Sequence, residues 1–296
     1  MKAISVINHK GGVGKTTIVV NLASAIARLG LNVLVIDLDP QANASLLIGK
    51  SHPSQVKVTS YDLLLNDDPQ QLNAAIHTDT TLSGVSLIYG SIRLAGIEES
   101  LRARSIRPAE HLAAYMQYLH GIYDIVLIDC PPALNLLTSN ALAACNYYVV
   151  PLMTGDQFGL YGADDLDYFV QRIRAANRQL ELLGVILMQH DRRQLVCRTI
   201  ADSIQERYRN VFSTTISRGT AVQQSILLNT SIVEMDSEHK VSREFRALAR
   251  ELLQKAGITP PKADRSKSAL KNQHNGMKNS QEQTLFNEKD DHDEIE

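Results

Sequence analysis

Residues 1–17 read Met-Lys-Ala-Ile-Ser-Val-Ile-Asn-His-Lys-Gly-Gly-Val-Gly-Lys-Thr-Thr, and this stretch decides the fold. It begins with an apolar, β-branched run over residues 3–8, which predicts a strand, and continues into a glycine-rich turn. From Thr17 to Leu29 apolar residues recur at helical spacing, and Gly30 ends that helix. Residues 33–36 form a continuous apolar run, typical of a strand buried on both faces of a parallel sheet. Together these segments predict a βαβ unit.

The same alternation continues along the chain. Further apolar runs predict strands at 85–88, 125–128, 147–150 and 185–187. Helical patterns occupy the intervening and following stretches 108–120, 159–175, 197–209 and 242–254. Strands that alternate with helices predict an α/β fold, a doubly wound, mostly parallel sheet flanked by helices, with ligands at the carboxyl ends of the strands.

Composition limits the possible functions. The chain has 296 residues, 44% of them hydrophobic, which predicts one domain of about 200–250 residues plus a tail. Its formal net charge of −2 gives no overall attraction to nucleic acid, so DNA binding would need a local basic patch. Cys130, Cys145 and Cys197 are widely spaced, which predicts neither a disulfide framework nor a zinc site. No signal-like segment and no run of about 18 apolar residues occurs, so we expect a cytoplasmic protein.

The end of the chain has a different composition. We expect a domain over 1–257 and a disordered polar tail over 258–296, because this last stretch has few apolar residues to bury. Lysine and arginine dominate the first half of the tail, and aspartate and glutamate dominate its end. It is interpreted as a solvated linker or, alternatively, as a contact arm for DNA or a partner.

The glycine-rich loop carries the first chemistry. Between a buried strand and a helix, its backbone N–H groups can converge on phosphates, and the helix dipole favours their negative charge. We expect Lys15 to neutralise the β- and γ-phosphates of ATP, Thr16 to offer its hydroxyl to Mg²⁺, and Thr17 to reach the α-phosphate. The alternative is a glycine-rich turn without a ligand.

Acidic residues end two of the predicted strands. Asp37 and Asp39 follow the run 33–36 and point to the same side, which suits metal and water, although such a pair can also cap the next helix. Asp129 ends the run 125–128 in the Walker B arrangement, so we expect it to bind Mg²⁺ through water. Cys130 is interpreted as a small buried residue.

The loop departs from the usual phosphate-binding pattern, because His9 stands where a glycine is standard and Lys10 is an extra lysine. It resembles the deviant Walker A loop of the ParA/MinD family of P-loop ATPases. The resemblance implies that Lys10 reaches across a dimer interface to the partner's nucleotide; alternatively Lys10 is a solvated loop charge. It also implies that Asp39, in a D-x-D-P-Q segment, orients the attacking water, and that Asp37 organises the Mg²⁺ shell or the loop. The expected nucleotide contacts are Lys10, Gly11, Gly12, Val13, Gly14, Lys15, Thr16 and Thr17.

The resemblance extends over roughly residues 1–255. Further matching segments are Asn140–Leu142 with Ala144, Pro151–Leu152, Leu160–Gly162 and Ile216–Arg218. The family usually has asparagine or glutamine where this chain has His9, and glycine where it has Ala42; neither change is expected to harm nucleotide binding.

Within the family, the branches differ in their appendages. The chain begins directly at its first strand, which disfavours a helix-turn-helix domain, and its acidic end disfavours the basic membrane helix of MinD-like members. None of the cysteines matches the motif of the iron–sulfur relatives. The resemblance therefore implies a ParA/Soj-like partition or positioning ATPase: a homodimer with ATP that binds nonspecific DNA on the nucleoid and moves a chromosome, plasmid or protein assembly. The alternative is a nucleotide-switched localisation or scaffold protein that acts on a protein complex or a membrane surface.

Such a protein converts ATP and water to ADP and phosphate. We expect slow turnover by the chain alone, because no arginine finger in cis is evident, and stimulation by a ParB-like or other cargo-adaptor activator.

DNA contacts are expected from Arg218, Lys240, Arg243 and Arg246, in a region that also holds Arg192, Arg193, Arg198 and Arg250. In 242–250 an apolar stripe leaves the arginines on other faces, and a solvated helix face is the alternative. Ala221 stands where relatives often have a further arginine.

Overall fold

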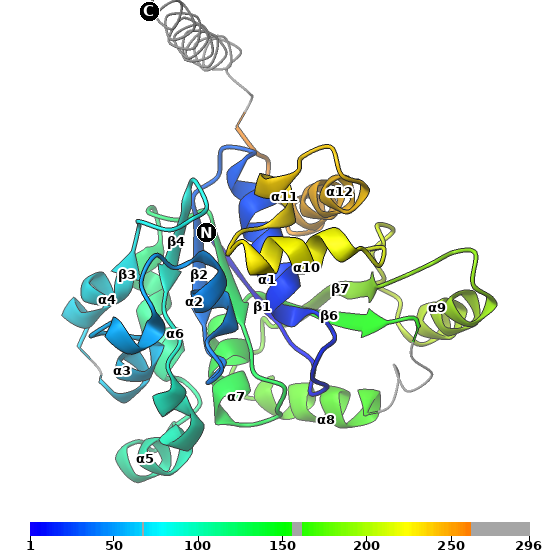
Figure 1. Cartoon of the computed structure of the whole chain (residues 1–296). Helices are drawn as coiled ribbons and strands as arrows, with labels where there is room; N and C mark the ends of the chain where they lie inside the picture. The colour runs from blue at the N-terminus through cyan, green and yellow to red at the C-terminus, as the bar shows by residue number, and fades with distance from the viewer. Residues whose placement is uncertain (67, 156–161, 262–296) are drawn as a thin grey trace, which may run out of the picture. The chain divides into compact units, whose positions relative to one another are not determined.

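The structure is a computed structural model that describes residues 1–66, 68–155 and 162–261. A seven-stranded sheet in the order β3-β4-β2-β5-β1-β6-β7 forms its centre (Figure 1). All strand pairs are parallel except β3 with β4, which confirms the predicted mostly parallel, doubly wound fold. The strands are β1 (Lys2–Val6), β2 (Val33–Asp37), β3 (Ile76–His77), β4 (Val85–Ile88), β5 (Ile125–Asp129), β6 (Tyr147–Met153) and β7 (Glu181–Met188).

Helices cover both faces of the sheet. They are α1 (Lys15–Ala27), α2 (Asn43–Ile48), α3 (Ser60–Leu65), α4 (Gln70–Ala75), α5 (Ile97–Arg104), α6 (His111–Met116), α7 (Leu136–Ala144), α8 (Ala163–Ile173), α9 (Leu195–Arg207), α10 (Thr220–Leu227), α11 (Ile232–Met235) and α12 (Lys240–Lys255). Short 3₁₀ turns lie at Pro53–Gln55, Ile92–Gly96 and Gln117–Leu119.

Two hydrophobic cores lie on opposite faces of the sheet, because successive side chains of a strand point to opposite sides. In β2, Leu34 and Ile36 belong to the core that α3, α5, α6, α7, α8 and α9 complete. Val33 and Val35 belong to the core under α1, α2, α11 and α12. All five residues of β2 are buried, so the continuous apolar run in the sequence reflects a strand covered on both faces.

The helix α1 is tied to the C-terminal helices by polar contacts as well. Asn21 accepts a 2.9 Å hydrogen bond from the backbone N–H of Ile232, and Arg28 pairs with Glu234 at 2.9 Å. The segment after the phosphate loop is thereby fixed against the part of the chain that carries α11 and α12.

The predicted helices are present with shifted ends. The pattern over 108–120 contains only α6 and a 3₁₀ turn, since Pro108 precedes a turn and the helix begins at His111. The short helices α2 to α5, α10 and α11 were not predicted, because each spans at most eight residues and shows little periodicity.

The chain separates into Met1–Pro260 and Pro261–Glu296 by its internal contacts. The predicted tail lies outside the described residues from 262 on, and its disorder and the boundary at 257 stay predictions. In the described ranges, no helix is long and apolar enough to cross a membrane.

Candidate nucleotide site and basic groove

The phosphate loop joins β1 to α1. Gly12 and Gly14 have φ angles of 76° and 92°, a left-handed conformation that side chains resist. Gly14 is also packed closely, because a Cβ there would lie 3.0 Å from Cε of Met188 at the end of β7. The helix α1 begins at Lys15 without a side-chain cap and without an acid in its first turn. Its uncapped N–H groups and its dipole therefore suit an anion.

The side chain of Lys15 is folded into the loop. It is only 7% exposed, and its Nζ donates a 3.0 Å hydrogen bond to the carbonyl oxygen of Lys10. Burial lowers the pKa of Lys15, and the nearby carboxylates of Asp129 and Asp39 act in the opposite direction. A buried ammonium held by one loop carbonyl is suited to exchange that bond for an anionic ligand.

Thr16 and Asp129 meet below the loop. The Thr16 hydroxyl donates a 2.7 Å hydrogen bond to Oδ2 of Asp129, which is fully buried. The other oxygen, Oδ1, is buried and has no hydrogen-bond partner among the described residues. Burial, followed by the charge of Asp37, raises the pKa of Asp129 well above its usual value. An under-bonded buried carboxylate beside a hydroxyl fits a hydrated cation.

Both carboxylate oxygens of Asp37 accept hydrogen bonds from the segment that follows β2. Oδ1 accepts from the N–H of Asp39 at 3.0 Å, and Oδ2 accepts from the N–H and hydroxyl of Ser45 at 2.9 and 2.7 Å. The same Ser45 hydroxyl accepts from the N–H of Gly90 at 2.8 Å. Asp37 thus connects the end of β2 to the start of α2, and burial raises its pKa to about 6.

Asp39 lies two residues beyond the strand and is 6% exposed. Its Oδ1 accepts a 2.9 Å hydrogen bond from the N–H of Gln41, which tightens the turn into α2. At Ala42, the N-cap of α2, φ is 51° and the backbone is left-handed. The position where the family usually has glycine therefore does require a glycine-like conformation.

The register of the sheet brings these groups together. Val6 and Asp37 are both paired with Asp129 in the parallel ladder, so the ends of β1, β2 and β5 lie side by side. The loop and the three acids were predicted from the sequence. No local signal pointed to Ser45, which is recognised only from its bonds to Asp37, or to Asn8, whose role depends on a contact with Pro151 143 positions away.

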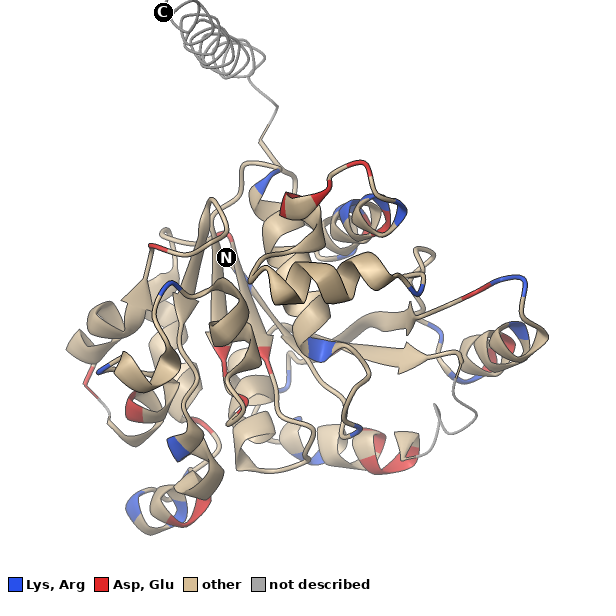
Figure 2. Cartoon of the chain, viewed as in Figure 1, with Lys and Arg blue, Asp and Glu red and all other residues tan. Residues whose placement is uncertain are grey.

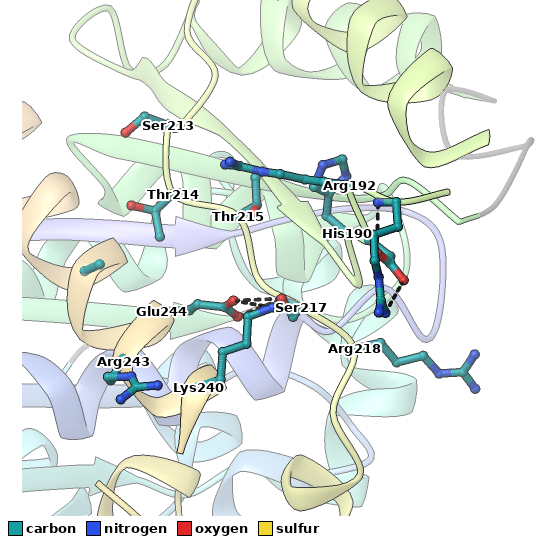
Figure 3. A pocket seen from close by; sticks show the side chains of 13 residues that line it. His190, Arg192, Ser213, Thr214, Thr215, Ser217, Arg218, Lys240, Arg243 and Glu244 are labelled. Carbon is teal, nitrogen blue, oxygen red and sulfur yellow. Dashed lines mark hydrogen bonds and ion pairs between the residues drawn. The ribbon is translucent and has the colours of Figure 1, made fainter. Parts of the chain in front are cut away.

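A second feature is a groove of about 820 Å³ beyond the end of β7. It lies between the loop after β7, the segment 213–218 and the first turns of α12 (Figure 3). In Figure 2, basic residues mark both the loop after β7 and the helix α12. The groove is lined by His190, Asp191, Arg192, Arg193, Ser213, Thr214, Thr215, Ser217, Arg218, Lys240, Arg243, Glu244 and Ala247.

The acids of the groove are engaged in local contacts. Asp191 accepts from Arg193 through both carboxylate oxygens at 3.0 Å, and this pairing lowers the pKa of Asp191. Glu244 accepts from the N–H and hydroxyl of Ser217 at 2.7 Å and lies 3.6 Å from Lys240. Three guanidinium groups, those of Arg192, Arg218 and Arg243, have no hydrogen-bond or ion-pair partner in the part of the chain that the structure describes.

Three of the four predicted DNA contacts therefore line one groove: Arg218, Lys240 and Arg243. The fourth, Arg246, does not line it and donates a 2.7 Å hydrogen bond to the carbonyl oxygen of Ser237. Arg198 and Arg250 also lie outside the groove lining. Of the other segments singled out in the sequence, Leu160 and Tyr161 lie outside the described residues.

The chain resembles known proteins over most of its length. A family model described as an AAA domain matches residues 1–182. The chromosome partitioning protein ParA of Caulobacter vibrioides is 35% identical over 258 residues, which cover 86% of this chain and 94% of that protein. The sporulation initiation inhibitor protein Soj of Bacillus subtilis is 32% identical over 259 residues, 85% of this chain and 98% of Soj.

Solved structures agree with this result. Cobyrinic acid a,c-diamide synthase from Mycobacterium smegmatis, with bound ADP and magnesium, superposes with a TM-score of 0.74 at 29% identity, covering 88% of this chain and 98% of that one. The septum site-determining protein MinD of Pyrococcus horikoshii, complexed with Mg-ADP, gives 0.69 at 25% identity, covering 86% and 97%. The fold and its loop define a P-loop ATPase. Within this class the chain belongs to the ParA/MinD family with the deviant Walker A loop, as its relatives ParA and Soj indicate.

Proposed function

We propose that this chain is a partition or positioning ATPase that dimerises with ATP, binds DNA nonspecifically in that state and moves a cargo over the nucleoid. The cargo is a chromosome, a plasmid or a protein assembly, and a ParB-like or other adaptor on the cargo stimulates hydrolysis. The similarity to chromosome partitioning proteins over 86% of the chain supports this proposal. The basic groove is the observation in the structure that carries its DNA-binding part.

In the proposed nucleotide site the loop amides and Lys15 bind the phosphates of ATP. The N–H groups of the loop and of the first turn of α1 supply donors, and Lys15, whose ammonium has three N–H donors, turns toward a phosphate. Lys10 serves the second subunit, so each nucleotide lies between two protomers. Turnover by the chain alone is slow, and an activating partner completes the site.

Mg²⁺ is assigned to Thr16 and Asp129. Described residues contain no group of three or more His, Cys, Asp or Glu that could hold a metal ion by themselves. Mg²⁺ is usually held by one or two protein groups, water and substrate phosphates. The under-bonded Oδ1 of Asp129 is the acceptor available to its water shell. When bound, the ion neutralises charge on the phosphates.

The two acids after β2 have separate proposed roles. Asp37 organises the loop, because both of its oxygens already accept hydrogen bonds from Asp39 and Ser45. Asp39 orients the attacking water. Among the described residues only its Oδ1 accepts a hydrogen bond, from the N–H of Gln41, which leaves Oδ2 for the water. Of the two roles predicted for Asp37, the three hydrogen bonds that its carboxylate accepts favour the organisation of the loop over that of the Mg²⁺ shell.

The groove is proposed as the DNA surface. Its unpartnered guanidinium groups and its serine and threonine hydroxyls are the donors that contact phosphate oxygens, which carry no sequence information. The two acids that line the groove, Asp191 and Glu244, are bonded to Arg193 and Ser217 and do not pair with these guanidinium groups. Dimerisation would place two such grooves on one duplex and double the number of phosphate contacts.

The test is retention of nonspecific duplex DNA with ATP and with ADP, over a range of salt concentrations. We expect ATP-dependent retention that Arg218→Ala and Arg243→Ala each weaken, and each removed arginine–phosphate interaction should reduce the salt slope by about 1. Arg250→Ala is the control, because Arg250 is an exposed arginine of the same helix outside the groove. If the wild type shows no ATP-dependent retention, the DNA-binding proposal is wrong and the scaffold function becomes the better explanation. If the wild type retains DNA and neither Arg218→Ala nor Arg243→Ala weakens this retention, the groove is not the DNA surface.

A further inference from the structure

The three residues before the glycines, Asn8, His9 and Lys10, are anchored to β6 and to the start of α8. Asn8 is 5% exposed, and its Nδ2 donates a 2.8 Å hydrogen bond to the carbonyl oxygen of Pro151 in β6. Its Oδ1 accepts a 2.9 Å hydrogen bond from the N–H of Lys10. The backbone that carries Lys10 is therefore tied to a neighbouring strand through Asn8.

The imidazole of His9 lies against Gly162, the N-cap of α8. A Cβ at Gly162 would overlap Cε1 and Nε2 of the ring and would lie 3.3 Å from Nδ1. Nδ1 is shielded from solvent and has no hydrogen-bond partner among the described residues. Among the described residues the ring is thus held by packing, and the absence of a side chain at Gly162 provides its space.

The backbone of Lys10 also depends on Lys15. The Lys10 carbonyl accepts from Nζ of Lys15. The ammonium of Lys15 has three N–H donors, so it can turn toward a phosphate and either keep or give up this hydrogen bond. The contacts of Asn8 and His9 do not involve Lys15, so they hold the backbone next to Lys10 in either case.

We infer that His9 is a positioning residue for Lys10: its ring, packed against Gly162, fixes the loop so that the Lys10 side chain can reach the second subunit. This inference rests on the proposed intermolecular role of Lys10. It gives Gly162 two reasons to be glycine, the close approach of His9 and a φ of 79°. It also explains how this chain accommodates histidine where the family usually has an amide side chain.

Gly162→Ala tests the contact, and Gly121→Ala is its matched control. Gly121 has a similar φ of 82°, but nothing lies within 4 Å of a Cβ placed there. Both variants carry a backbone strain of about 1–2 kcal/mol, and only Gly162→Ala displaces the His9 ring. We expect Gly162→Ala to lower ATP-dependent dimerisation and kcat about 10-fold, since small misplacements of catalytic groups have large effects. Its monomer should bind ATP within about twofold of the wild type, like Gly121→Ala.

The route through His9 is tested by double variants. We expect His9→Ala to reduce ATP-dependent dimerisation about threefold, and Gly162→Ala to add no further reduction in that background, because the overlap with the ring is gone. His9→Asn, which introduces one of the two residues usual in the family, should dimerise better than His9→Ala. In a Lys10→Ala background neither change should lower dimerisation further.

Two results would overturn this inference and leave the proposed role of Lys10 standing. One is equal ATP-dependent dimerisation of Gly162→Ala and Gly121→Ala. The other is a dimerisation defect of Gly162→Ala that persists in the His9→Ala background. Should Gly162→Ala not fold, wild-type dimerisation and turnover in His9→Ala would overturn it. If Lys10→Ala itself dimerises and turns over normally, the intermolecular role of Lys10 is wrong and the inference falls with it.

Discussion

The hydroxyl of Thr16 donates a 2.7 Å hydrogen bond to Oδ2 of Asp129 and so joins the first turn of α1 to the end of β5. The bond orients a carboxylate whose other oxygen has no partner among the described residues. The loop that would receive the phosphates is thus connected to the strand that would hold the ion. Variants of the loop and of the strand should separate phosphate binding from Mg²⁺ binding.

Asp129→Asn should weaken the use of Mg²⁺. The amide keeps the size of the side chain but removes the charge that orders the water shell of the ion. We expect the Mg²⁺ concentration for half-maximal turnover to rise, or turnover to fall, about 10–100-fold. A Mg²⁺ titration of ATP hydrolysis measures this, and Asp124→Asn, at the residue just before the start of the same strand, is the control. An unchanged Mg²⁺ dependence in Asp129→Asn would assign the ion to other residues.

Lys15→Ala should abolish tight ATP binding. Its ammonium is buried at the loop, so the substitution removes a charge-assisted bond to phosphate that we expect to be worth about 2–5 kcal/mol. Titration with a fluorescent ATP analogue measures the affinity. Lys50→Ala, which removes a surface lysine paired with Asp79, should bind like the wild type. Retained affinity in Lys15→Ala would contradict the nucleotide assignment.

Asp39→Asn should separate hydrolysis from binding. The amide oxygen can still accept from the N–H of Gln41, so the turn into α2 is kept while the negative charge is removed. We expect ATP binding and ATP-dependent dimerisation to persist and turnover to fall about 100-fold. Asp39→Ala should show the same separation with a looser turn. Normal turnover in both variants would mean that another group orients the water.

The parts of the site that follow from local patterns could be predicted from the sequence. The phosphate loop and Asp129 were recognisable because a glycine turn after a buried strand, and an acid at a strand end, are local features. The bonds of Asp37 to Ser45 and of Asn8 to Pro151 depend on long-range packing that one sequence does not specify.

Which of the arginines line the groove also could not be predicted from the sequence alone. Arg243 and Arg246 are one helical turn apart in α12, yet only Arg243 lines the groove, while Arg246 donates to the Ser237 carbonyl. The arginine-rich pattern indicated a basic region, but the direction of each side chain is determined by the segments packed around the helix.

The stability of the protein should depend on pH through Asp37. Burial raises the pKa of Asp37 to about 6 from an ordinary value of 3.8, so the folded protein holds this proton more tightly than the unfolded chain. The stabilisation is therefore complete below about pH 4 and disappears as the pH rises through about 6. Relative to Asp37→Asn, the free energy of unfolding of the wild type should fall across this window by an amount on the order of 3 kcal/mol. Urea unfolding without nucleotide measures it, and a constant difference between pH 4 and 7 would contradict it.

Ala42→Gly should stabilise the protein. Ala42 has a φ of 51° at the N-cap of α2, and a Cβ in the left-handed region costs about 1–2 kcal/mol, whereas glycine avoids this cost. Part of the gain is offset by the greater freedom of glycine in the unfolded chain, so we expect a net increase of about 1 kcal/mol in the free energy of unfolding. Ala114→Gly, at an exposed position inside α6, is the control and should lower it by about 1 kcal/mol. Ala42 follows the turn that holds Asp39, so the turnover of Ala42→Gly should be measured as well. A stabilised variant with unchanged kcat would show that the backbone strain at Ala42 plays no part in hydrolysis. Equal destabilisation of Ala42→Gly and Ala114→Gly would rule out the strain at Ala42.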